Sequence, residues 1–254
     1  MRFEGLNATA SSACVLVTYA CTALFASSLP ANGQTVSVTA QIEIIGERQS
    51  RAAKKDRANV VVWLSPLEEH GLHPVSDATP AQVPRLVQKE KKFIPHVLVV
   101  EAGTAVEFPN RDPFFHNVFS LFEGKRFDLG LYEAGTTRTV HFDRVGVSYI
   151  FCNIHPEMNA VVIALKTPYY GISDATGKVE IPDVAAGRYT VQVWAEATGL
   201  ERLKSLSRVV SISESDRSLG VIRVVQDRPP EPHKNKYGRD YDVPGTDYPS
   251  NPQK

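Results

Sequence analysis

Four side chains of the types that bind copper lie in two short stretches of the sequence. Cys152, His155 and Met158 fall within one stretch of seven residues, and His116 lies upstream in the segment 110–117. Two histidines, one cysteine and a weakly bound methionine are the ligand set of a type 1 (blue) copper site. Thiolate and thioether suit Cu(I), and imidazole suits either oxidation state. The residues therefore predict one type 1 copper ion, bound by these four side chains.

The rarity of cysteine and methionine sharpens this prediction. The chain has three cysteines and two methionines. Cys14 and Cys21 lie in a predicted export signal, and Met1 is the initiator, so the mature protein keeps Cys152 and Met158. A lone cysteine in an exported protein indicates intermolecular pairing, a reactive thiol or a metal ligand.

The first 31 residues have the pattern of a secretory signal peptide. Arg2 precedes an apolar run over 13–26, and the small residues Ser27, Ser28 and Ala31 follow it. The run is short for a membrane span, although an uncleaved anchor is the alternative. We expect a periplasmic or secreted protein with no membrane span in its mature form.

The overall charge gives no support for nucleic acid or a charged membrane as a partner. Twenty-eight basic and 28 acidic residues give a formal net charge of zero, so no global charge favours nucleic acid or an anionic membrane.

Other roles for the candidate ligands fit the sequence less well. Zinc prefers more thiolate or carboxylate ligands than this set offers. A cysteine hydrolase is unsupported, because Cys152 follows a strand and has no activating lysine or helix N-terminus nearby. The alternative to a metal site is that these residues are structural: a buried cysteine, a polar loop histidine and a core methionine.

Short strands separated by turns predict an all-β protein. Residues 36–44 alternate strictly between apolar and polar, as in a half-buried strand. Two strands, over 148–152 and 159–165, bracket the stretch that carries Cys152. Regularly spaced strands and turns after residue 167 indicate a further sandwich. The remaining expected strands cover 59–64, 97–100, 104–108, 118–122, 138–142, 178–182, 189–196, 208–212 and 220–225.

Residues 108–118 and 149–158 resemble the two ligand segments of the cupredoxins, most closely amicyanin and its plastocyanin and pseudoazurin relatives. The compact C-x2-H-x2-M spacing is that of amicyanin. The resemblance implies copper on the four residues named above and a neighbouring amide at Asn117 that ties the two ligand loops together. It also implies that His155, beside Pro156, is the solvent-facing ligand and the electron exit.

The flanking segments resemble a different family. Residues 172–194, with the pattern G-x-Y-x-V-x-V-W over 187–194, resemble the carboxypeptidase-regulatory, transthyretin-like sandwich. We expect a Greek-key cupredoxin β-sandwich inserted in this second small sandwich, with two tandem domains as the alternative. The expected parts are a signal peptide (1–31), N-terminal strands of the regulatory-like sandwich (35–66), a linker (67–92), the copper domain (93–166), the regulatory-like sandwich (167–226) and a disordered tail (227–254).

The resemblance, which extends to plastocyanin-like proteins associated with methylamine utilisation, implies an exported carrier of single electrons. Its partners would be a protein electron donor and a protein electron acceptor, and it would turn over no substrate, so we do not expect an enzyme. Copper storage or delivery is an alternative that predicts a more exposed site with additional methionine or histidine ligands. A β-sandwich binding module with a non-redox site is another.

Overall fold

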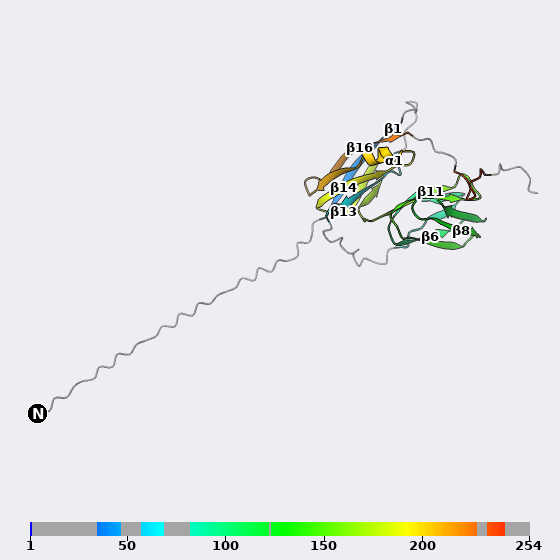
Figure 1. Cartoon of the computed structure of the whole chain (residues 1–254), viewed down its shortest axis with the longest axis horizontal. Helices are drawn as coiled ribbons and strands as arrows, with labels where there is room; N and C mark the ends of the chain where they lie inside the picture. The colour runs from blue at the N-terminus through cyan, green and yellow to red at the C-terminus, as the bar shows by residue number, and fades with distance from the viewer. Residues whose placement is uncertain (2–34, 47–56, 69–81, 122, 228–232, 242–254) are drawn as a thin grey trace, which may run out of the picture. The chain divides into compact units, whose positions relative to one another are not determined.

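The computed structural model describes residues 1, 35–46, 57–68, 82–121, 123–227 and 233–241 (Figure 1). The predicted signal peptide, apart from Met1, lies outside these residues. Within the described ranges, no helix has both the length and the apolar character that crossing a membrane requires. The described part of the chain is almost entirely β, as predicted, with one short helix, α1 (Leu200–Ser205).

Two sheets form what we call the host sandwich. One sheet has the order β13-β1-β16 and the other β12-β2-β14-β15. The alternation predicted for β1 is confirmed, because its inward side chains, including Val38 and Ile42, are fully buried. The strands are β1 (Thr35–Gly46), β2 (Val61–Pro66), β12 (Tyr170–Ile172), β13 (Lys178–Ala185), β14 (Gly187–Trp194), β15 (Arg208–Ile212) and β16 (Ser218–Gln226).

Strands β3 to β11 form what we call the inserted sandwich. A five-stranded sheet of order β5-β11-β10-β7-β8 encloses an apolar core together with the pairs β6-β9 and β3-β4. The strands are β3 (Val87–Lys89), β4 (Lys92–Ile94), β5 (Val97–Glu101), β6 (Thr104–Pro109), β7 (His116–Ser120), β8 (Phe127–Tyr132), β9 (Thr137–Phe142), β10 (Gly146–Cys152) and β11 (Asn159–Leu165).

Strand pairing shows that one sandwich interrupts the other. Strand β2, before the insertion, pairs with β12 and β14 after it, and β1 pairs with β13 and β16. Figure 1 shows this as blue β1 lying beside orange β16. The insertion predicted from the sequence is therefore the observed arrangement, rather than two tandem domains. An apolar cluster joins the two sandwiches, with Val61 and Trp194 on the host side and Val97, Val161 and Ile163 on the inserted side.

The inserted sandwich begins earlier than residue 93, inside the segment predicted as a linker. Leu86 and Gln88 are fully buried in it, and β3 and β4 form a hairpin. Both turn residues, Glu90 and Lys91, have φ of 55°, the left-handed conformation of a two-residue hairpin turn. That turn usually carries Asn-Gly or Asp-Gly, so Glu-Lys gave no hairpin signal. Strand β8 and helix α1 were also not expected.

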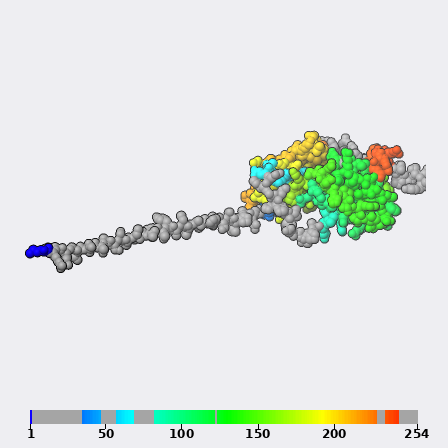
Figure 2. All heavy atoms as spheres, turned by 60° about the horizontal axis from the view of Figure 1, so that its bottom comes forward, coloured from blue at the N-terminus to red at the C-terminus, as the bar shows by residue number. Residues whose placement is uncertain are grey.

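Part of the predicted disordered tail is placed against the inserted sandwich. Residues 233–241 make side-chain contacts with the end of β10 and with β8, which differs from the tail predicted over 227–254. Aliphatic residues are scarce in this segment, and the prediction was based on that scarcity. The observed contacts are polar and aromatic instead. In Figure 2 these residues form the orange-red patch beside green atoms of the inserted sandwich.

Candidate metal centre

Three of the four predicted ligands meet at one point in the inserted sandwich. The Cys152 Sγ atom lies 3.6 Å from Nδ1 of His116 and 3.6 Å from Nδ1 of His155. The three ligand atoms lie within 4.8 Å of one another. Cys152 and His116 are fully buried, whereas His155 is half-buried. The structure therefore places one sulfur and two imidazole nitrogens so that they face a shared position.

Neighbouring strands of one sheet bring these residues together. Cys152 ends β10 and pairs with Val118 of β7, two residues after His116 begins that strand. After Cys152 the chain makes a tight turn, in which the Met158 amide donates to the His155 carbonyl (3.1 Å). The Cys152 amide donates to the Met158 carbonyl (3.2 Å), which closes the loop before β11 begins. The compact spacing of the motif is thus the length of one closed turn between two paired strands.

Met158 is fully buried in the same apolar cluster as Cys152. Its backbone participates in the closed turn through both hydrogen bonds described above. A buried thioether beside a buried thiol fits the weak axial position of a type 1 site, whose ligand can be distant. The axial role of Met158 itself stays a prediction.

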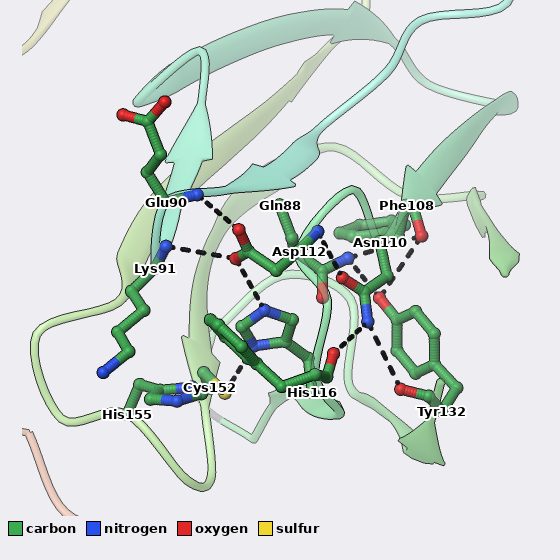
Figure 3. Close-up of polar contacts among 11 residues, drawn as sticks. Gln88, Glu90, Lys91, Phe108, Asn110, Asp112, His116, Tyr132, Cys152 and His155 are labelled. Carbon is green, nitrogen blue, oxygen red and sulfur yellow. Dashed lines mark hydrogen bonds and ion pairs between the residues drawn. The ribbon is translucent and has the colours of Figure 1, made fainter. Parts of the chain in front are cut away.

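A carboxylate that sequence reasoning missed orients His116. Asp112 Oδ2 lies 2.9 Å from Nε2 of His116, and both side chains are almost completely buried (Figure 3). An ionised carboxylate can only accept a hydrogen bond, so Nε2 carries the proton and donates it, while Nδ1 keeps its lone pair and faces the Cys152 sulfur. The only sequence signal for this contact was an aspartate four residues before the histidine.

The hairpin formed by β3 and β4 holds this carboxylate. The backbone amides of Glu90 and Lys91 donate to the two oxygens of Asp112, at 2.5 and 3.1 Å (Figure 3). The side chain of Asn110 also accepts the Asp112 amide (3.0 Å) and donates to the Phe114 carbonyl (2.8 Å), which shapes the loop before β7. The left-handed turn of the hairpin thus positions two amides that hold Asp112, and Asp112 in turn orients His116.

The local electrostatics keep both imidazoles neutral near pH 7. Burial lowers the pKa of His116 below its usual value of 6.5, although the hydrogen bond to Asp112 acts in the opposite direction. Burial and the nearby His116 lower the pKa of His155. Burial alone would raise the pKa of Asp112, but hydrogen bonds from Lys91, His116 and Glu90 hold it below its usual value. Neutral imidazoles are the form that binds metal.

Asn117 makes a contact different from the one that the resemblance implied. Its side-chain amide donates to Asp128 Oδ1 (2.7 Å) on β8, not to the loop that carries His155. Successive side chains of a strand point to opposite faces, so Asn117 points away from the face that His116 occupies. The two ligand segments are tied by the backbone instead, through the Asn153 amide and the Asn117 carbonyl (2.8 Å).

The half-buried His155 lies beside the ring of Phe114, and the charged side chains of Lys91 and Glu157 are also close to it. The Phe114 ring centroid is 5.4 Å from that of His155 and 5.3 Å from that of His116. Phe115 is 51% exposed and Ile154 is 43% exposed. Pro156, predicted to flank the electron exit, is also exposed. Of the two histidines, His155 is the one with access to solvent.

The spacing of the donor atoms fits a bound metal ion. Metal–sulfur and metal–imidazole bonds of about 2.3 and 2.0 Å, separated by an angle of about 110–120°, put sulfur and nitrogen about 3.5–3.7 Å apart. The observed separations of 3.6 Å match this expectation. Cys152 is a free, fully buried cysteine. His116, Cys152 and His155 could therefore hold a copper ion with little rearrangement.

No protein-family model and no curated protein matches the chain. Similar solved structures include a purple cupredoxin from Nitrosopumilus maritimus (22% identity, TM-score 0.30), covering 32% of this chain and 99% of that one. A reduced amicyanin mutant is 19% identical with a TM-score of 0.32, covering 35% of this chain and 87% of that one. A copper nitrite reductase from Thermus scotoductus is 19% identical with a TM-score of 0.31, covering 48% of this chain and 28% of that one. The assignment of chemistry therefore depends on the side chains of this chain.

Proposed function

We propose that this chain is an exported type 1 copper protein of the cupredoxin class that carries single electrons between protein partners. The observation that supports this most directly is the Cys152 sulfur, held 3.6 Å from the Nδ1 atoms of both His116 and His155. When bound, copper would supply the one-electron Cu(II)/Cu(I) couple. We further propose Met158 as the axial ligand and the periplasm or the extracellular space as the location.

The protein's contribution is a set of ligands that is already oriented. Asp112 fixes the ring of His116, and paired strands fix Cys152, so these donor atoms need not move when the oxidation state changes. Small ligand movement keeps electron transfer fast. The burial of Cys152 also protects its thiolate from oxidants, which favours redox cycling over labile storage.

Electrons would enter or leave through His155. It is the ligand that reaches the surface, and the exposed apolar side chains of its neighbourhood would offer a weakly hydrated contact for another protein. The exposed side chains of Phe115 and Ile154 would meet the donor or the acceptor in turn. A small apolar contact suits brief encounters, because weak electron-transfer complexes bury little surface.

The test is the visible absorption spectrum of the mature protein after addition of Cu(II). We expect an intense blue thiolate-to-copper band that is bleached by a reductant and absent from Cys152→Ser. Met158→Leu is the matched control, since it conserves volume and leaves the thiolate in place, and it should keep an intense thiolate band.

Two other outcomes would contradict the proposal in different ways. If copper binds without an intense thiolate band, then storage or delivery becomes the better function. If the protein binds no copper, the ligand assignment is wrong and a β-sandwich binding module is the better description.

A further inference from the structure

The C-terminal segment 233–241 contacts three consecutive residues at the end of β10. The His233 ring stacks on Phe151, with ring centroids 4.2 Å apart and planes 27° apart. The Tyr241 hydroxyl donates to the Cys152 carbonyl (2.6 Å). The backbone amide of Lys236 donates to Asn153 Oδ1 (2.9 Å). We call this segment the C-terminal clamp.

The clamp also reaches the strand that carries His116. Lys236 Nζ lies 2.8 Å from Asp128 Oδ2, and Asp128 Oδ1 accepts from the Asn117 side chain at 2.7 Å. The Lys236 side chain is 19% exposed and that of Asp128 is 38% exposed, so this ion pair is partly shielded from water. Hydrogen bonds from Lys236 and Asn117 to Asp128 hold the pKa of its carboxyl below its usual value, against the effect of burial. The clamp therefore connects the surroundings of both ligand segments.

The hydrogen bonds of the clamp form a chain that leads from His233 through Tyr241 to the Cys152 carbonyl. His233 Nδ1 faces two oxygens, the Lys234 carbonyl (3.2 Å) and the Tyr241 hydroxyl (3.1 Å). A carbonyl can only accept, so Nδ1 carries the proton and donates. The Tyr241 hydroxyl then accepts from His233 and donates to the Cys152 carbonyl. Linked hydrogen bonds of this kind polarise and strengthen one another.

We propose that the C-terminal clamp is part of the metal centre, and that Tyr241 is a positioning residue that acts on the copper through the Cys152 carbonyl. The proposal rests on the proposed copper function. Tyr241 lies 89 positions from Cys152 in the sequence, yet it donates to the backbone of the ligand that would give the site its colour. The clamp holds Cys152 and Asn153 in place before the loop turns toward His155.

Two effects follow from this geometry. First, a clamped backbone opens less often, so a metal held in the loop leaves more slowly. Second, a hydrogen bond to the Cys152 carbonyl withdraws electron density from that residue and so favours Cu(I) over Cu(II). Removing the donor should therefore accelerate copper release and lower the reduction potential.

The experiment compares Tyr241→Phe with Tyr237→Phe in the full mature chain. Tyr237 belongs to the same segment and is 71% exposed, and its side chain interacts with Lys236 rather than with the Cys152 carbonyl. We expect Tyr241→Phe to release copper to a chelator about two- to tenfold faster, as for the loss of one hydrogen bond. The double variant Tyr241→Phe with Lys236→Ala should release it faster still. The reduction potential should fall in Tyr241→Phe and stay unchanged in Tyr237→Phe.

A second measurement uses the copper-free protein. Hydrogen exchange of the Asn153 amide, which bonds to the Asn117 carbonyl, should be faster in Tyr241→Phe than in the wild type or in Tyr237→Phe. If both variants match the wild type in exchange, copper release and potential, the positioning role is wrong. If the wild type binds no copper, the copper function and the role of Tyr241 at the metal both fail, and faster exchange would leave only a structural contact.

Discussion

The host sandwich and the inserted sandwich each bury an apolar core but differ in the polar groups they bury. Ten polar or charged residues are buried in the described part of the chain, and seven of them belong to the inserted sandwich. Several of the seven, including Asn110, Asp112 and His116, bond to one another around the metal centre. Burying polar groups costs free energy unless they are paired. The polar groups whose burial costs free energy are therefore concentrated near the candidate ligands, whereas the host sandwich buries few of them.

The largest expected effect is the loss of stability from a cavity in either core. Leu64 in the host and Ile150 in the inserted sandwich are fully buried, and changing either to alanine should lower the free energy of unfolding by about 2–5 kcal/mol. Leu64→Ala should leave the copper spectrum unchanged below the unfolding transition. Ile150→Ala should also weaken copper binding, because Ile150 lies on β10, two residues before Cys152. Urea unfolding and copper titration measure both effects.

A changed copper spectrum in Leu64→Ala would break this comparison. It would mean that the apolar cluster joining the sandwiches transmits packing defects to the metal centre.

A smaller effect is expected from changing one buried polar side chain in each sandwich. Asp112→Asn conserves shape but replaces the charged carboxylate whose oxygen accepts from His116, and it should weaken copper binding about 10–100-fold. Ser173→Ala removes a host hydroxyl that accepts from the Val60 amide (2.9 Å). This loss should cost about 1–3 kcal/mol of stability without altering copper affinity. Competition with a chelator of known affinity gives the copper result, and urea unfolding gives the stability.

Equal copper affinities in Asp112→Asn and the wild type would show that the buried carboxylate does not orient the ligand. Weaker copper binding in Ser173→Ala would show that polar burial in the host is not merely structural.

The smallest expected effect is a difference in how histidines respond to pH in the copper-free protein. Burial lowers the pKa of His116 in the folded protein, so as the pH falls His116 is protonated more readily in the unfolded chain than in the folded one. The free energy of unfolding therefore decreases as the pH drops below about 6.5. The pKa of His96 is raised by its hydrogen bond to Glu196 on the host side (2.9 Å). Its contribution is complete below about pH 6.5 and is lost as the pH rises through the folded-state pKa.

Urea unfolding at about pH 5.5 and about pH 7.5 separates the two contributions. The wild type should be less stable at the lower pH, because His155 shares the sign of His116. The variant His96→Gln should lose more stability, relative to the wild type, at pH 5.5 than at pH 7.5. An equal loss at both values would show that the exposed pair of His96 and Glu196 contributes nothing measurable.

The features predictable from the sequence were those encoded by local spacing. The alternation of residues 36–44 gave β1, and the spacing of Cys152, His155 and Met158 gave a closed turn between two strands. The insertion was expected because strands with the same family resemblance lay on both sides of the copper motif. These patterns are short-range or repeat along the chain, so a single sequence displays them.

The supporting contacts were not predictable because they depend on tertiary placement. Asp112 matters through two amides of a hairpin whose turn residues give no turn signal. Tyr241 matters through one hydrogen bond across 89 positions, from a segment whose composition indicates disorder. In both cases a few polar contacts replace the apolar periodicity on which sequence interpretation depends.

The insertion has a consequence for the order in which the molecule assembles. Strand β2 pairs with β12 and β14, so forming this sheet of the host brings together strands separated by about a hundred residues of the chain. Closing a flexible segment costs entropy that grows with its length, by about 0.6 kcal/mol per doubling. Strands β5 and β11 pair side by side near the start and end of the insertion, so its folding brings the two host segments close together. Once the inserted sandwich is folded, the host sheet no longer has to close a long flexible segment, so the entropic cost of pairing β2 with β12 and β14 is smaller.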